Sequence, residues 1–346
     1  MKELIPVTIL TGFLGSGKTT VLRHLGQLGR LEKTLVLVNE FGEMGLDHEL
    51  LVPIDDDALV AVASGCICCT IRADLVQTLS EAPWRYARAG SRWFDRVIIE
   101  TTGIADPAPI LQTILGDHRV TKQYELVSVL TTVDAVNGLR ALEQHSEAVK
   151  QVAVADRILL TKLDVVATNT APLQKLLKRL APGASIHSVL AGAANPDWFF
   201  RTGLYSLSGK SADVEAWLNS ELSLSVEQHA GHDLGHEHDL NRHGRIEAIC
   251  LAFAQPVDPA LFESCLHMLM EFRGADLLRV KGIVNVQGMD RPMVIHGVQH
   301  VFHPPEILEQ WPGDDRRTRL VIIARDLNQK ELRKAFSALG LEANER

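Results

Sequence analysis

The stretch that decides the fold is Gly12-Phe13-Leu14-Gly15-Ser16-Gly17-Lys18-Thr19. It matches the pattern G-x-x-x-x-G-K-[ST], in which glycines let successive backbone N–H groups turn toward phosphate oxygens. The apolar run Val7-Thr8-Ile9-Leu10 before it predicts a strand, and residues 19–28 after it carry apolar side chains at helical spacing. Strand, loop and helix in this order are the context that the pattern requires, so we predict a phosphate-binding loop.

Individual residues of this loop have expected roles. Lys18 places its ammonium between the β- and γ-phosphates of a nucleotide, and the Thr19 hydroxyl is a ligand for Mg²⁺. The start of the following helix adds a favourable dipole for an anion. The residues expected to hold the nucleotide here are Gly12, Gly15, Ser16, Gly17, Lys18, Thr19 and Thr20.

The rest of the first half of the chain alternates short apolar runs with helical patterns. Runs that are apolar at mostly consecutive positions indicate strands covered on both faces, hence a parallel sheet. They lie at residues 35–38, 97–99, 126–133, 158–160 and 186–189. We therefore expect an α/β fold, with a doubly wound, mostly parallel sheet as a P-loop NTPase domain over residues 1–205.

Two segments at strand ends are predicted to complete the nucleotide site. Glu100 ends a buried strand, where an acid holds Mg²⁺ or its water, and Gly103 supplies a backbone N–H that senses the γ-phosphate. Thr161-Lys162-Leu163-Asp164 follows another strand and matches the N/T-K-x-D base-recognition pattern. A carboxylate at Asp164 accepts from guanine N1–H and the exocyclic amine, which favours GTP over ATP. Thr161 lacks the side-chain amide of the asparagine that is common at this position, which predicts modestly lower guanine selectivity. For Glu100, the alternative is an ordinary acid at the end of a strand with no role in Mg²⁺ binding.

The second strong feature is the thiol cluster Ser64-Gly65-Cys66-Ile67-Cys68-Cys69. Thiolates favour Zn²⁺, Cu(I) and related ions. Cys66 and Cys68 point the same way on an extended segment, and Cys69 joins them through a local turn. Three thiolates leave one tetrahedral position open for a departing ligand. The alternative is inert buried thiols, which is what we expect of Cys250 and Cys265.

Acidic and histidine residues provide further metal-ligand candidates. Glu40 and Glu43 follow the second strand, where a nucleotide-sensing loop lies in this class of fold, although an exposed turn with incidental acids is the alternative. Residues 206–243 are predicted to form a linker that contains a histidine-rich tract. This tract either binds metal ions weakly or is a solvated segment whose histidines are incidental. Its histidines are His229, His232, His236, His238 and His243.

Beyond the linker, residues 244–346 predict a small C-terminal α+β domain. Strands are expected at 246–253, 277–286, 292–302 and 319–324, and helices at 259–272 and 329–339. This order suggests a ferredoxin-like arrangement.

Composition excludes several classes of function. The 346 residues carry a net charge of −8 and only 5% aromatic residues, which disfavours nucleic-acid partners. The apolar stretches are far shorter than the ~20 residues that span a bilayer, so no membrane partner is expected. Met1-Lys2-Glu3 leads directly into the first strand, so we expect no cleaved signal peptide. An odd cysteine count argues against a disulfide framework and for a reducing compartment.

Six motifs together resemble the CobW-like family of P-loop GTPases, relatives of the metallocentre-maturation proteins HypB and UreG. They lie at residues 12–20, 39–43, 65–69, 100–107, 161–164 and 279–282. The resemblance implies a cytoplasmic, Mg²⁺-dependent GTPase that binds Zn²⁺ or Co²⁺ at the cysteine motif and inserts the metal into client metalloproteins. It also implies that Glu43 helps to bind metal. The resemblance leaves open whether two copies of the chain form a homodimer.

The thiol cluster lies between two nucleotide-sensing segments, so the leading hypothesis is a metal donor gated by GTP. No glutamine follows Gly103 to orient water, which predicts slow intrinsic turnover. The alternatives are a P-loop kinase for a small molecule, and a nucleotide-controlled metal-storage or scaffold protein.

Overall fold

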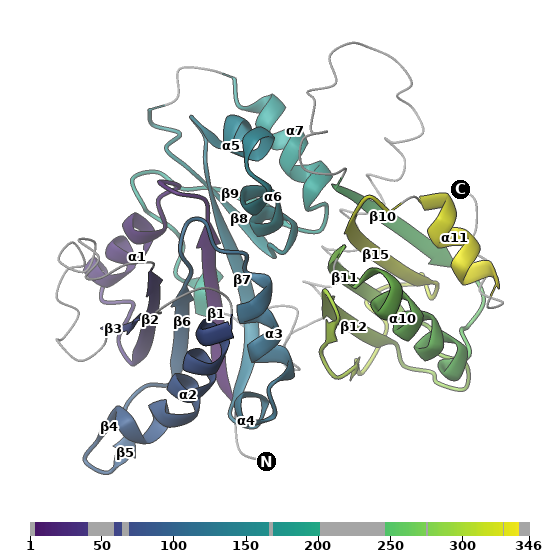
Figure 1. Cartoon of the computed structure of the whole chain (residues 1–346), viewed down its shortest axis with the longest axis horizontal. Coiled ribbons are helices and arrows are strands. Elements are labelled where there is room, and N and C mark those ends of the chain that lie inside the picture. Colours follow the sequence, from purple (N-terminus) through teal and green to yellow (C-terminus); the bar gives the residue numbers. More distant parts are fainter. Residues whose placement is uncertain are drawn as a thin grey trace. The chain divides into compact units, whose positions relative to one another are not determined.

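The structure is a computed structural model that describes residues 4–40, 59–63, 69–165, 169–200, 246–274, 276–327 and 329–338. The chain divides into two compact units, one comprising residues 1–175 and 184–206 and the other residues 176–183 and 207–346 (Figure 1). The predicted domain limits at 205 and 244 and the whole predicted linker lie outside the described residues. Among the helices that the structure describes, none combines the length and apolarity needed to cross a bilayer.

The first unit is built on a seven-stranded sheet in the order β3-β2-β6-β1-β7-β8-β9. Every neighbouring pair in it is parallel, as predicted. The strands are β1 (Ile5–Gly12), β2 (Thr34–Glu40), β3 (Leu59–Ala63), β6 (Arg96–Glu100), β7 (Tyr124–Asp134), β8 (Arg157–Thr161) and β9 (Ser185–Ser188). Six of them coincide with the predicted runs, and the edge strand β3 is an addition. A short hairpin, β4 (Ala87–Arg88) with β5 (Ser91–Arg92), lies outside this sheet.

Helices connect these strands. They are α1 (Lys18–Gln27), α2 (Cys69–Arg85), α3 (Ala108–Gly116), α4 (His118–Thr121), α5 (Gly138–Gln144), α6 (Ser146–Ala153), α7 (Ala171–Leu180) and α8 (Asp197–Phe200). In α1, Val21, Leu22 and Leu25 are one turn or less apart and pack against buried side chains of the sheet such as Leu10. The Tyr124 hydroxyl donates a 2.7 Å hydrogen bond to a carbonyl of α2. The strands are apolar at nearly every position because helices pack against the sheet and bury their side chains.

The strand register decides where the functional loops lie. Leu10 is level with Glu100 in the β1–β6 pair, and Gly12 is level with Thr132 in the β1–β7 pair. Asp134 is level with Thr161 at the ends of β7 and β8. Because parallel strands end at one edge of a sheet, the loops that follow them meet there.

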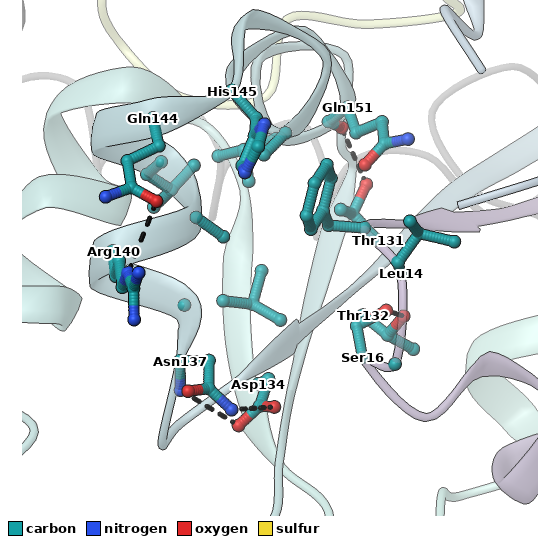
Figure 2. A pocket seen from close by; sticks show the side chains of 18 of the residues that line it. Leu14, Ser16, Thr131, Thr132, Asp134, Asn137, Arg140, Gln144, His145 and Gln151 are labelled. Atoms are coloured by element: carbon teal, nitrogen blue, oxygen red, sulfur yellow. Dashed lines mark hydrogen bonds between the residues drawn. The ribbon is translucent and has the colours of Figure 1, made fainter. Parts of the chain in front are cut away.

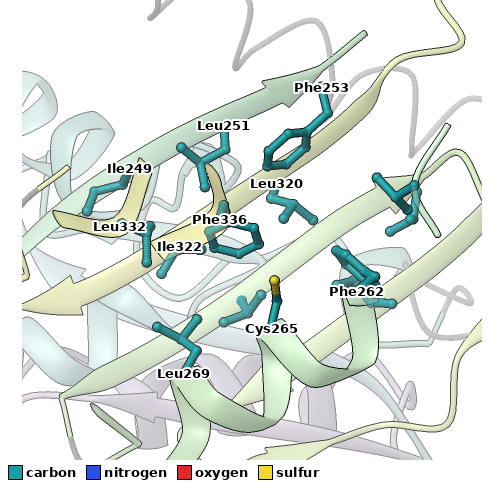
Figure 3. Close-up of a cluster of buried hydrophobic side chains, with 14 of the residues drawn as sticks. Ile249, Leu251, Phe253, Phe262, Cys265, Leu269, Leu320, Ile322, Leu332 and Phe336 are labelled. Atoms are coloured by element: carbon teal, nitrogen blue, oxygen red, sulfur yellow. The ribbon is translucent and has the colours of Figure 1, made fainter. Parts of the chain in front are cut away.

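The second unit is an antiparallel sheet in the order β10-β15-β11-β12-β13, with β14 also paired to β12. Its strands are β10 (Ile246–Phe253), β11 (Leu277–Val284), β12 (Met293–Val298), β13 (Val301–Phe302), β14 (Glu306–Ile307) and β15 (Thr318–Arg325). The helices are α10 (Pro259–Arg273) and α11 (Gln329–Ala338). Their side chains, including Phe262, Cys265 and Phe336, share one hydrophobic core with the sheet (Figure 3).

The predicted α+β composition of this unit is confirmed, but the ferredoxin-like arrangement is wrong. In a ferredoxin-like chain a helix stands between the third and fourth main strands. Here the second helix, α11, follows the last strand, β15. The predicted strand over 292–302 is also divided into β12 and β13, because the chain turns at residues 299 and 300.

Asp315 makes the stability of the second unit dependent on pH. Hydrogen bonds from the Arg317 side chain, at 2.8 Å for Nη2–Oδ2, outweigh burial and lower the pKa of Asp315 to about 2. A depressed pKa contributes stability above the unfolded value near 3.8, and that stability is lost as the pH falls toward 2. Asp315→Asn should therefore cost about 1 kcal/mol at pH 6 and clearly less at pH 3.

Thermal unfolding at the two pH values measures this difference. Asp314→Asn, at the exposed neighbouring position, is the matched control and should leave the unfolding temperature unchanged. An equal loss for Asp315→Asn at pH 6 and pH 3 would contradict the assignment.

Candidate nucleotide and metal site

The predicted phosphate loop closes around the side chain of Lys18. Gly15 and Gly17 have φ values of +69° and +96°, which other residues adopt only under strain. Lys18 is 8% exposed, and its ammonium donates hydrogen bonds to the carbonyl oxygens of Gly12 at 2.8 Å and Phe13 at 3.4 Å. The loop therefore holds one positive charge at the start of α1, as the motif predicts.

Two threonines from neighbouring strands fix this loop through Ser16. The Ser16 hydroxyl lies 2.6 Å from the Thr132 hydroxyl, and the Thr161 hydroxyl donates to the Ser16 carbonyl at 2.7 Å. Thr161 also donates to the Val133 carbonyl at 3.2 Å. The first residue of the T-K-x-D segment thus positions the phosphate loop, a role that the sequence analysis missed.

The two predicted magnesium ligands are in contact. The Thr19 hydroxyl donates to Glu100 Oε1 at 3.1 Å, and Glu100 is buried at the end of β6. A hydroxyl and a carboxylate are oxygen ligands of the kind that Mg²⁺ prefers. The donor set therefore fits the ion.

Gly103 lies directly against the phosphate loop. A Cβ atom at this position would come within 2.7 Å of the backbone of Leu14. Helix α6 holds the same segment, because Gln151 Nε2 donates to the carbonyls of Gly103 and Ala105 at 3.2 and 3.0 Å. Lys150 adds a 2.7 Å ion pair with Asp106. The segment that follows Glu100 is thus tied to the nucleotide loop at one end and to α6 at the other.

Gly103→Ala should separate these two loops. The added methyl group meets backbone that cannot rotate away, so we expect a loss of about 1–3 kcal/mol in stability and roughly 10²-fold in the GTP hydrolysis rate. Unfolding curves and phosphate release measure the two effects. Gly313→Ala is the matched control, because nothing lies within 4 Å of a Cβ there. Equal behaviour of the two variants would contradict the assignment.

The base-recognition segment is anchored by an acid that the sequence analysis did not single out. Lys162 Nζ pairs with Asp134 Oδ2 at 2.7 Å. Burial raises the pKa of Asp134, but hydrogen bonds from Lys162, Asn137 and two backbone amides outweigh it and bring the pKa below its ordinary value. The carboxylate is therefore charged at neutral pH. Its position at the end of β7, before a turn, was the available signal. Asp164 is exposed next to this pair.

The loop that follows β9 also contacts this site, and the sequence analysis did not predict it. A Cβ atom on Gly192, whose φ is +83°, would lie 2.7 Å from the carbonyl oxygen of Thr20. This loop therefore touches the start of α1 on the side of the nucleotide-binding residues.

The predicted zinc ligands are only partly within the described residues. Cys66, Cys68 and Glu43 lie outside them, as do all five histidines of the linker tract. Glu40 ends β2 and Cys69 begins α2, and only their backbones are described. In the portion of the chain with described side chains, no group of three or more potential metal-binding residues is found.

The remaining cysteines behave largely as expected. Cys265 is buried in the core of the second unit, and burial raises the pKa of its thiol to about 11. A buried thiol with a raised pKa fits the expected role of a small apolar core residue. Cys250, on β10, is half-buried.

A parallel sheet, a phosphate loop between β1 and α1, an acid at the end of β6 and a T-K-x-D segment after β8 define a P-loop nucleotide-binding protein. Residues 6–188 match the model of the CobW/HypB/UreG nucleotide-binding domain. Residues 246–339 match that of the cobalamin synthesis protein CobW C-terminal domain. The chain belongs to the CobW/HypB/UreG family.

Similar proteins match along nearly the whole chain or along half of it. The zinc chaperone YjiA of Escherichia coli K12 is 32% identical over 97% of this chain and 98% of its own. The zinc-regulated GTPase metalloprotein activator 1 of Schizosaccharomyces pombe is 34% identical over 50% of this chain and 43% of its own. The crystal structure of Zn(II)-bound YjiA GTPase from E. coli is similar with a TM-score of 0.67 and 28% identity, covering 98% of this chain and 99% of that one.

Proposed function

We propose that this protein is a Mg²⁺-dependent GTPase that binds Zn²⁺ through Cys66, Cys68 and Cys69 and transfers it to a client metalloprotein. The observation that carries the proposal is the register of β2 and β3. Glu40 is level with Ala63, so both strands end at the sheet edge where the phosphate loop begins. The cysteine segment starts one residue after Ala63, which links it directly to the nucleotide edge.

The nucleotide chemistry follows from the residues at this edge. Backbone N–H groups of the phosphate loop and the ammonium of Lys18 bind the phosphates, and they counter the charge that develops as the γ-phosphoryl group leaves. Thr19 and Glu100 would hold Mg²⁺, which supplies further charge neutralisation when it is bound. Gly103, packed on Leu14, would report the presence of the γ-phosphate to α6 through Gln151.

Guanine selectivity is assigned to the segment after β8. Asp164 would accept the two N–H groups that guanine presents and adenine lacks. The Asp134 pair restrains Lys162, and the Thr161 hydroxyl ties the segment to Ser16. The base-recognition and phosphate-binding loops are therefore one connected unit.

Zinc is the cargo of the reaction rather than a resident cofactor. GTP would order the loops at the sheet edge and set the positions of the thiolates, and hydrolysis would relax them and release the ion. A nearly complete switch needs zinc affinities that differ by about 10⁴-fold between nucleotide states, which corresponds to roughly 5.5 kcal/mol.

The test is the zinc affinity of the full chain with Mg²⁺ and either a non-hydrolysable GTP analogue or GDP. Competition with a chromophoric chelator gives both constants. We expect clearly different values in the two states. Equal values would remove the gating, and the protein would then be a GTPase that also stores metal.

The same proposal covers the client protein, the choice of metal and the cellular compartment. The names of the relatives, zinc chaperone and metalloprotein activator, support a zinc-requiring client. Co²⁺ is the runner-up metal, and closely spaced thiols favour a reducing compartment such as the cytoplasm. Radiolabelled γ-phosphate recovered only as inorganic phosphate would exclude the kinase alternative.

A further inference from the structure

A cavity of about 370 Å³ opens beside the phosphate loop. Its walls come from the loop, the end of β7, and helices α5 and α6 (Figure 2). Of the residues proposed to hold nucleotide, only Gly15, Ser16 and Lys162 line it. Lys18, Thr19, Glu100 and Asp164 are not among its lining residues. The cavity is therefore separate from the proposed Mg²⁺ ligands.

Directly behind the inner wall of the cavity lies a buried acceptor, Gln151 Oε1, without a donor. Gln151 is fully buried, and its Nε2 is committed to the carbonyls of Gly103 and Ala105, which fixes the orientation of the amide. Its Oε1 has no hydrogen-bond partner among the described residues. In Figure 2 this oxygen lies on the side of Thr131, which lines the cavity, and the nitrogen points the other way. An unpaired buried amide oxygen destabilises the protein, so a ligand that donates to it gains binding free energy.

The remaining walls define what kind of donor fits. Leu142, Ala148 and Val152 make an apolar surface, which disfavours a charged ammonium. Phe13 adds an aromatic ring, which is stacked on His145 with a centroid distance of 4.5 Å. An N–H on a flat aromatic ring meets both conditions, because the ring packs on apolar walls while the N–H bonds the acceptor.

The rim of the cavity carries positive charge. Lys162 is neutralised by Asp134, whereas Arg140 hydrogen-bonds through Nε to the neutral amide of Gln144 at 3.2 Å. The guanidinium of Arg140 is exposed there. A ligand with an anionic substituent would place that group at the rim.

We propose that this cavity binds a planar aromatic heterocycle with a ring N–H and an anionic substituent. The N–H donates to Gln151 Oε1, the ring lies beside Phe13, and the anion pairs with Arg140. The volume is within the range of small-molecule sites. Gln151 Oε1 is covered by the side chains that line the cavity. A lining side chain, such as that of the half-exposed Phe13, therefore has to shift before the ligand can reach this oxygen. The inference does not rest on the proposed zinc transfer.

The probe for this site is indole-3-acetate, and 1-methylindole-3-acetate is the matched analogue without the N–H. Calorimetry and ligand-observed NMR are done on the full chain loaded with GDP and Mg²⁺. We expect saturable binding of indole-3-acetate, at least tenfold weaker binding of the methyl analogue, and no displacement of GDP. Absence of binding up to millimolar probe means that the oxygen binds water alone and overturns the proposal. Equal affinity of the two probes, or competition with GDP, also overturns it.

Two variants locate the binding. Ala141→Phe fills the cavity and should abolish binding, whereas Ala171→Phe, at an exposed alanine outside it, should not. Arg140→Ala should weaken indole-3-acetate and leave unsubstituted indole unchanged. Binding that survives in Ala141→Phe contradicts the site. If that variant fails to fold, the comparison of the two probes on the wild-type chain decides.

Discussion

Lys18→Ala is expected to lower the rate of GTP hydrolysis by about 10³-fold. The ammonium is nearly enclosed by the phosphate loop, with its hydrogen bonds directed to the carbonyls of Gly12 and Phe13. Alanine removes the positive charge that we propose binds the leaving phosphate, and no other lysine lies in the loop. Phosphate release under single-turnover conditions, at GTP concentrations that saturate the variant, measures the chemical step.

Lys33→Ala is the matched control for this experiment. Lys33 is exposed and its side chain forms a 3.5 Å surface pair with Asp95, so replacing that side chain should change neither the hydrolysis rate nor the stability appreciably. Circular dichroism verifies that both variants are folded. Hydrolysis by Lys18→Ala at a rate near that of the wild type would mean that this loop is not the site of GTP cleavage.

The second large effect is expected for Cys68→Ser, which should weaken zinc binding by at least about 10²-fold. Changes to groups that only support a metal ligand cost 10–100-fold in affinity, and loss of a ligand itself costs more. A serine hydroxyl stays protonated at neutral pH and is a poor ligand for a soft site. Chelator competition, with GTP analogue and with GDP, gives the affinity in each state.

Cys265→Ser separates loss of a ligand from general damage. This thiol is buried in the core of the second unit, so its replacement should lower stability and leave zinc affinity unchanged. Cys68→Ser should hydrolyse GTP at its basal rate, because the phosphate loop is intact. Unchanged zinc affinity in Cys68→Ser would show that the metal is bound elsewhere and would favour a scaffold function.

Local patterns were sufficient for the nucleotide loops. The strands β1, β6 and β8 were predicted because a strand in the middle of a parallel sheet is apolar at nearly every position. The motifs at Gly12–Thr19 and Thr161–Asp164 carry their own spacing, and both occur at the ends of these strands. The second unit was less predictable, since its strand order depends on long-range pairing that no local pattern encodes.

What the sequence by itself determined is the kind of chemistry to expect: it predicts glycines, Lys18 and Thr19 for phosphate, Asp164 for guanine, and thiols for zinc. These assignments depend on residue type and spacing, which are properties of short segments. Only the tertiary structure revealed how Thr161 fastens the phosphate loop, how Asp134 restrains Lys162, and how Gln151 joins α6 to the segment after Glu100. Each of these contacts joins residues from different strands or helices. It therefore forms only after the parallel sheet has brought the carboxyl ends of its strands to one edge.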